Sequence, residues 1–315
     1  MKTWKTPAPL YEDPIFAGPS DPCVIRNQET GEWWMFYTQR RVSDNTPGVS
    51  GIHGTDIGIA ISADAKHWLY RGKAEGLAYE WGHNTYWAPE VVWTGSLYHM
   101  FVTYIQGVPS DWTKEAKILH YTSENLWQWR FSDAPDLHSD RVIDACIACT
   151  GSGAYKLWYK DECRFSHTVA AVSPDLIHWN VVGEEICDVP HEGPNVFSLG
   201  GWNWMITDTW NGLGVYRSDD YTHWTRQDED ILSAPGVRPS DGQIGNHADV
   251  VTVGSLGYIF YFVHPDYPAH RRSDAPKTIP AKKQHTVIQC AVLRVRDGKL
   301  VCDRNEDFDI ADMLK

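Results

Sequence analysis

A phrase that recurs four times along the chain limits the folds that it can adopt. Each copy is a short apolar strand that ends in Ser and is followed by a turn and a Trp. The copies span residues 57–68, 118–129, 169–179 and 214–224. Their closing residues, Trp68, Trp129, Trp179 and Trp224, are separated by 61, 50 and 45 residues. Spacings near ~40–50 residues are typical of the blades of β-propellers.

A strand rich in aromatic residues precedes each copy, at 32–38, 97–105, 154–162 and 202–210. A fifth such strand at 257–265 is followed by strands at 286–295 and in GKLVCD at 298–303, without the Trp. Only the C-terminal EDFDIADMLK has a helical pattern. We therefore predict an all-β protein, a single five-bladed β-propeller over residues 1–315. A β-sandwich also contains many short strands, but it does not require repetition at blade length.

The composition excludes several classes of partner. The chain has 28 Lys and Arg against 41 Asp and Glu, a formal charge of −13, so a nucleic acid would be repelled. No run approaches the ~18 apolar residues of a membrane span, and the first residues lack a secretion signal. We expect a cytoplasmic protein with no membrane partner, whose seven cysteines are free thiols. Cys146 and Cys149 form a C-x-x-C pair on a predicted strand, where they face opposite sides and do not suit a zinc or redox role.

The first strand of each blade lines the axis of a propeller, and these strands are predicted at 21–25, 90–93, 144–149, 193–199 and 247–253. Their leading residues, Asp21, Glu90, Asp144, Glu192 and His247, should meet at one end of the central channel. A single Asp there would be an ordinary turn residue, but five such residues at equivalent places indicate function. Crowded carboxyl groups separate into an ionised base and a protonated acid, the pair that glycoside hydrolysis needs. Inverting and retaining geometries both fit a channel mouth.

These motifs resemble those of glycoside hydrolase family 43 and its clan of five-bladed glycosidases, over nearly the whole chain. The similar segments are SDP at 20–22, YWAPE at 86–90, VIDAC around residue 144, HEGPNVF at 191–197 and GNHAD at 245–249. The resemblance implies that Asp21 is the general base and Glu192 the general acid. It implies that Asp144 tunes the acid and orients the substrate, and that Glu90, where the family has Asp, lines the sugar site. His247 would approach the active centre, in some relatives through a bound calcium.

Five further residues are candidates for contacts with the substrate. Trp87 is a stacking surface for a sugar, or a core residue. His53 lies in a Gly-rich loop at 48–55 that folds over the channel, or is a turn residue. Arg40, with Arg41, binds sugar hydroxyls or a carboxylate, or pairs with surface acids. Asp208 and Trp210 end an aromatic strand and border the pocket.

The resemblance implies an inverting, exo-acting hydrolase of short oligosaccharides, of the α-L-arabinofuranosidase or β-D-xylosidase type. Galactofuranosides, fructosides and anhydrogalactosides stay open as substrates. A propeller phosphorylase, with Arg40, Arg41 and His53 holding phosphate, and a non-catalytic sugar-binding propeller are the alternatives. No cofactor is required, although a structural calcium near His247, bound through water, stays open. The oligomeric state does not follow from the sequence.

Overall fold

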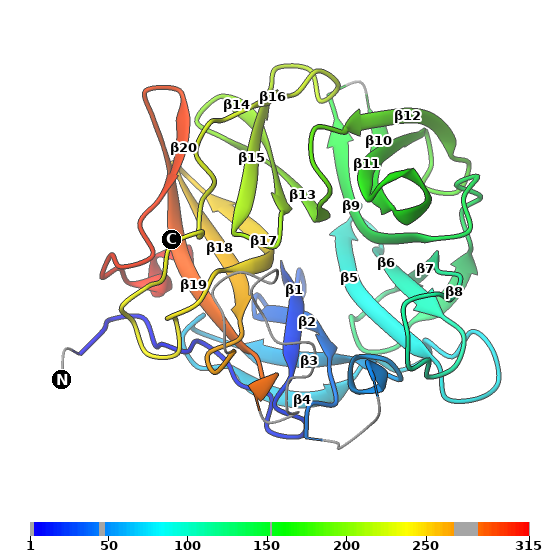
Figure 1. Cartoon of the computed structure of the whole chain (residues 1–315), viewed down its shortest axis with the longest axis horizontal. Coiled ribbons are helices and arrows are strands. Elements are labelled where there is room, and N and C mark those ends of the chain that lie inside the picture. The colour runs from blue at the N-terminus through cyan, green and yellow to red at the C-terminus, as the bar shows by residue number, and fades with distance from the viewer. Residues whose placement is uncertain (1–2, 44–47, 152, 268–282, 315) are drawn as a thin grey trace.

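The computed structural model of the chain describes residues 3–43, 48–151, 153–267 and 283–314. Five antiparallel sheets of four strands each are arranged around a central axis (Figure 1). Within each sheet the strands pair in chain order. The prediction of an all-β, five-bladed propeller is confirmed.

Each blade follows the strand order that the repeats predict. Blade 1 consists of β1 (Pro19–Arg26), β2 (Trp33–Gln39), β3 (Asp56–Ser62) and β4 (Leu69–Lys73). Blade 2 consists of β5 (Thr85–Trp93), β6 (Tyr98–Ile105), β7 (Lys117–Ser123) and β8 (Arg130–Asp133). Blade 3 consists of β9 (Val142–Thr150), β10 (Ala154–Asp161), β11 (His167–Ser173) and β12 (Asn180–Ile186). Blade 4 consists of β13 (Glu192–Leu199), β14 (Trp202–Asp208), β15 (Leu213–Ser218) and β16 (Thr225–Arg226). Blade 5 consists of β17 (Asn246–Val253), β18 (Leu256–Val263), β19 (Val287–Arg296) and β20 (Lys299–Cys302).

Short 3-10 helices lie outside the sheets. They are η1 (Ser50–Ile52), η2 (Glu162–Arg164) and η5 (Ile310–Leu314). The last of these is the helical part of the C-terminal segment. No helix in the described part of the chain is long and apolar enough to cross a membrane.

The blades stack face to face around the axis, so their middle strands are covered on both sides. The first strands β1, β5, β9, β13 and β17 each contact the first strands of both neighbouring blades, and the ring closes between β17 and β1. Apolar clusters fill the spaces between adjacent blades. Between blades 1 and 2, for example, the ring of Phe36 on β2 meets that of Trp129 edge-on at 5.8 Å. Packing between blades accounts for many of the 40 aromatic residues of the chain.

The segment before blade 1 joins the first blade to the last. Leu10 donates its main-chain N–H to the carbonyl of Ile288 on β19 (2.8 Å), and Ile288 N–H donates to the carbonyl of Tyr11 (2.9 Å). The hydroxyl of Thr6 donates to the carbonyl of Phe308 (2.6 Å) and accepts from the N–H of Ile310 (2.9 Å). The two ends of the chain are therefore bonded to each other across the closure of the ring.

The recurring phrase has a local structural cause. After β3, Asp64 Oδ1 accepts the N–H groups of Lys66 and His67, and the indole of Trp68 donates to the carbonyl of Ala65 (2.9 Å). The equivalent turns after β7 and β11 make the same bonds through an Asn or Asp and the indole of a Trp. The repeat thus conserves a side-chain-capped turn that leads into the fourth strand.

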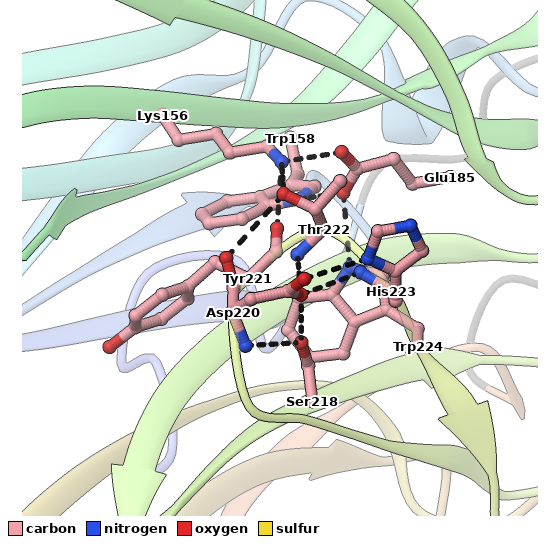
Figure 2. Close-up of polar contacts among 9 residues, drawn as sticks. All are labelled: Lys156, Trp158, Glu185, Ser218, Asp220, Tyr221, Thr222, His223 and Trp224. Carbon is pink, nitrogen blue, oxygen red and sulfur yellow. Dashed lines mark hydrogen bonds and ion pairs between the residues drawn. The ribbon is translucent and has the colours of Figure 1, made fainter.

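The turn of blade 4 has the same cap, because Asp220 Oδ1 accepts the N–H groups of Thr222 and His223, but its Trp contacts a buried ion pair of blade 3 (Figure 2). There the indole of Trp224 donates to Glu185 Oε2 (3.0 Å) on β12, which also accepts from the indole of Trp158 (2.8 Å). The other oxygen of Glu185 pairs with the ammonium of Lys156, which donates to the carbonyl of Tyr221 (2.7 Å) as well. The side chains of Lys156 and Glu185 are only 6% and 7% exposed. This cluster fastens blade 3 to blade 4.

Replacing Glu185 by Gln should destabilise the protein strongly, because it leaves the Lys156 ammonium buried without an opposite charge. Breaking a buried pair by removing one partner costs about 3–5 kcal/mol. Equilibrium denaturant unfolding of the variant measures the loss. The control is Asp56→Asn, which removes the ion pair between Asp56 and Lys73. Their side chains are 42% and 59% exposed, so loss of this pair should lower the free energy of unfolding by less than ~1 kcal/mol. Equal losses in the two variants would contradict this role of Glu185.

Candidate active site

A β-bulge interrupts the first strand of every blade near its start. The bulges lie between Ser20 and Cys23, Trp87 and Glu90, Ile143 and Cys146, Glu192 and Asn195, and Asn246 and Ala248. Four of them contain a residue with positive φ: Asp21 (48°), Ala88 (45°), Asp144 (58°) and Gly193 (58°). A left-handed backbone is costly for residues other than Gly. Bulges of this kind redirect side chains beside active sites, and here they turn Asp21 and Asp144 towards one end of the axis.

Only glycine fits at the bulge of blade 4. A Cβ built on Gly193 would lie 2.6 Å from Cγ of the His247 ring, on the neighbouring blade. The main-chain N–H of Gly193 also donates to Asp144 Oδ2 (3.0 Å) on the other side. Gly193 therefore lets three blades approach closely at the site.

A cavity of about 480 Å³ lies at the bulged ends of the inner strands. It is lined by groups from blades 1, 3, 4 and 5 that the sequence predicted as catalytic or substrate-binding: Asp21, Asp144, Glu192 and His247. The predicted contact residues Arg40, Trp87 and Trp210 line it as well. The structure thus brings seven of the ten predicted site residues to one cavity.

Asp208 and His53 lie behind the lining and support it. The buried Asp208 carboxylate accepts the main-chain N–H groups of His247 (2.9 Å) and Trp210 (2.7 Å), so it holds two lining residues in place. The ring of the buried His53 packs against those of Trp87 (4.7 Å between centroids) and Trp112 (5.6 Å). We call Trp87 and Trp112, which both line the cavity, the aromatic wall. His53 backs this wall rather than contacting the cavity.

Glu90 does not line the cavity, which corrects its predicted position. Strand β5 begins at Thr85, five residues before the predicted start, and the residue equivalent to Asp21 and Asp144 is Ala88. The bulge of blade 2 therefore separates Glu90 from the mouth of the channel. Glu90 lies two residues further along the strand and points to the axis.

Five buried residues at this deeper position form what we call the axial ring: Cys23, Glu90, Cys146, Asn195 and Asp249. Main-chain N–H groups of the next blade donate to four of them: Val91 to Cys23 Sγ (3.2 Å), Ile147 to Glu90 Oε1 (2.9 Å), Val196 to Cys146 Sγ (3.2 Å) and Val24 to Asp249 Oδ2 (2.6 Å). The Asn195 amide donates to Asp249 Oδ1 (2.9 Å). Cys149, exposed on the other face of β9, lies outside the ring.

Glu90 makes a testable link between pH and stability. Burial, with the charge of Asp249, raises the pKa of Glu90 from 4.5 to about 8. The folded state therefore binds a proton that the unfolded chain releases, and stability falls as the pH rises from about 4.5 through 8. Glu90→Gln keeps the shape without the titration, so melting temperatures should show the wild type losing stability relative to the variant across this range. Parallel melting curves at all pH values would contradict the assignment.

The Asp21 carboxylate faces two cationic groups. Its Oδ1 lies 3.6 Å from Arg40 Nη2 and 3.6 Å from His247 Nδ1, and the hydroxyl of Ser20 donates to Oδ2 (3.1 Å). Burial would lower the pKa of His247, but the charges of Asp144 and Asp21 raise it above its ordinary value. Positive charge therefore lies beside the Asp21 carboxylate.

Two other carboxyl groups have raised pKa values. Burial raises the pKa of Asp144 to about 6 against the opposing charges of His247 and Lys160. Burial and the charge of Glu192 raise the pKa of Asp208 to about 7. The site therefore contains carboxyl groups whose pKa values are raised towards neutral pH, as general acid and base chemistry requires.

Sequence reasoning missed Lys160, Glu162 and Trp112, which all line the cavity. Lys160 was within reach, because it sits near the end of the aromatic strand predicted at 154–162 and pairs with Ile143, next to Asp144. Arg40 and Asp208, which are predicted site residues, stand at the ends of other second strands. Trp112 lies in the loop after β6, which carries no repeat signal.

The three candidate phosphate ligands do not all reach the cavity. Arg40 lines the cavity and faces Asp21, whereas the Arg41 guanidinium donates to the carbonyls of Ser50 (2.7 Å) and His53 (3.0 Å). Among the described residues, no three His, Cys, Asp or Glu side chains lie where they could hold a metal ion together.

Solved structures with a similar fold include several glycosidases. A thermostable family-43 glycoside hydrolase superposes with a TM-score of 0.70 at 18% identity, over 93% of this chain and 96% of that one. A family-32 β-fructofuranosidase from Bombyx mori gives 0.69 at 12% identity, over 95% and 66%. A family-43 β-xylosidase/α-arabinofuranosidase from a compost metagenome, solved with xylotriose, gives 0.67 at 12% identity, over 92% and 96%.

A scan of the sequence against protein-family models found no match, and a search of curated proteins found none either. At these identities the structural likeness establishes the fold. The chain is a five-bladed β-propeller of the kind that these glycosidases have.

Proposed function

We propose that the protein is a glycoside hydrolase that cleaves its substrate by a single displacement with inversion. The observation that carries this proposal is the convergence of Asp21, Asp144 and Glu192, from three different blades, on one cavity. A non-catalytic sugar-binding propeller would not need strained bulges that aim carboxylates into its pocket. The fold shared with known glycosidases supports the same conclusion.

Asp21 and Glu192 have complementary roles in this reaction. Asp21, whose carboxylate faces Arg40 and His247, removes a proton from a water molecule that attacks the anomeric carbon. Glu192 donates a proton to the departing glycosidic oxygen on the other face of the sugar. Both steps occur in one transition state, so the anomeric configuration is inverted.

Asp144 assists the acid and holds the substrate. Its carboxyl accepts the N–H of Gly193, the residue next to Glu192, which fixes the two groups relative to each other. Above the pKa of about 6, the negative charge of Asp144 favours the protonated form of Glu192. Its other carboxyl oxygen can accept a hydrogen bond from a hydroxyl group of the sugar ring.

The aromatic side chains suit a neutral sugar. The aromatic wall offers ring faces, and the ring of Trp210 lines the same cavity beside Lys160. A cavity of about 480 Å³ suits a short oligosaccharide that is cleaved from its end. We infer α-L-arabinofuranosides or β-D-xylosides as substrates, the activities named for one structural neighbour.

The test is release of chromophore from a panel of aryl glycosides that covers α-L-arabinofuranoside, β-D-xyloside, β-D-galactofuranoside and β-D-galactoside. One member should be hydrolysed, and Asp21→Asn should abolish that activity because the base is lost. Glu192→Gln should lower kcat/KM by about 10²–10⁴-fold for substrates with poor leaving groups, which need the proton, and much less for activated aryl glycosides.

Asp56→Asn, which removes a partly exposed ion pair at the start of β3 in blade 1, is the matched control for both variants. Equal losses with good and poor leaving groups would contradict the acid role of Glu192. If the wild-type protein released chromophore from no member of the panel, with or without added phosphate, the result would contradict the proposed sugar class and the phosphorylase alternative.

A further inference from the structure

A buried lysine pairs with the proposed general acid. Lys160, near the end of β10, has its side chain 4% exposed, and its Nζ lies 3.2 Å from Glu192 Oε2. A cation so close favours the carboxylate form of Glu192, whereas an acid catalyst must be protonated. The contact with Lys160 alone would therefore oppose the protonated form of Glu192 that the reaction needs.

We propose that Lys160 is a positioning residue that sets the charge state of Glu192 and thereby the upper limit of the pH range in which the enzyme works. This inference rests on the proposed role of Glu192 as the acid. It assigns a function to a residue that does not transfer a proton itself.

The lysine is held firmly on the wall of the cavity. Its ammonium also lies 3.3 Å from Glu162 Oε1 and 5.3 Å from the centre of the Trp210 ring. Glu162 is itself paired with Arg141, whose guanidinium donates to the carbonyl of Trp112 (2.7 Å) in the aromatic wall. The ammonium of Lys160 is therefore shared between the carboxylates of Glu192 and Glu162, and Arg141 holds Glu162 in place.

The charge of Lys160 persists despite its burial. Burial would lower its pKa, but the carboxylates of Glu192, Asp144 and Glu162 raise it above the ordinary value. The coupling is reciprocal, since a carboxylate that stabilises the ammonium is stabilised by it to the same extent.

Other charged groups face Glu192 from the neighbouring strands. Asp144 on β9 and Asp208 on β14 disfavour its carboxylate form, and His247 on β17, when protonated, favours it. Lys160 on β10 is a cation in direct contact with the Glu192 carboxylate. The charge of Lys160 thus offsets the effect of the two aspartates on the charge state of Glu192. Glu162 weakens this effect because it shares the Lys160 ammonium.

Substitutions of Lys160 and of Glu162 should shift the alkaline limb of the pH profile of kcat/KM in opposite directions. Lys160→Met removes the cation, so Glu192 keeps its proton to higher pH and the alkaline limb of kcat/KM should move up by roughly 1–3 pH units. Glu162→Gln leaves the ammonium to Glu192 alone and removes a nearby negative charge, so the limb should move down. Lys160→Arg retains the charge and should leave the limb near its wild-type position.

A second readout does not depend on turnover. In protein labelled with ¹³C at the glutamate carboxyl groups, the Glu192 signal is assigned by its absence in Glu192→Gln and titrated by NMR. Its midpoint should rise in Lys160→Met and fall in Glu162→Gln, with circular dichroism confirming that each variant is folded. If Lys160→Met does not fold, the fall in Glu162→Gln alone tests the proposal.

Midpoints that stay unchanged in the folded variants would overturn the role of Lys160. Loss of activity at every pH without a shift of the limb would also overturn it, because that pattern indicates only substrate contact or structure. A shifted midpoint in a protein that hydrolyses no glycoside would instead retain the coupling and refute the proposed function.

Discussion

The hydrogen bonds of the axial ring are the constraint on which the rest of the structure depends. Each blade is a separate sheet, and the inner strands β1, β5, β9, β13 and β17 meet only through side chains and edge groups near the axis. There four side chains of the ring accept main-chain N–H groups from the next blade, beginning with the bond from Val91 to Cys23 and ending with the bond from Val24 to Asp249. The fifth, Asn195, donates to Asp249. These bonds fix the height of each inner strand relative to its neighbours. The bulges directly above the ring then carry the site residues at a common level.

This arrangement separates the carboxyl groups by function. Glu90 and Asp249 lie in the ring, where burial raises the pKa of each and hydrogen bonds to neighbouring blades engage them. Asp21, Asp144 and Glu192 lie one bulge away and reach the cavity. A shift of two residues along one strand thus changes a carboxyl group from a part of the cavity into a part of the framework.

The blades could be predicted from the sequence because each one repeats chemistry that is local. The Ser-Xaa-Asp turn of blade 1 and its counterparts need particular side chains within a few residues, and the aromatic strands need apolar residues on both faces. Asp21, Asp144 and Glu192 could be placed because they stand at the starts of inner strands. A bulge leaves no such pattern, so the register error at Glu90 could not be detected. The pairing of Lys160 with Glu192 joins different blades and follows only from the assembled ring.

We propose that Asp21 and Glu192 act together in a single displacement within this cavity. Proton NMR of the first sugar released from a hydrolysed substrate is the direct test, since the anomeric signals show the configuration before mutarotation. The first product should be the anomer of inverted configuration. A first product of retained configuration would contradict it, because retention requires one of these carboxylates to attack the sugar rather than to activate water.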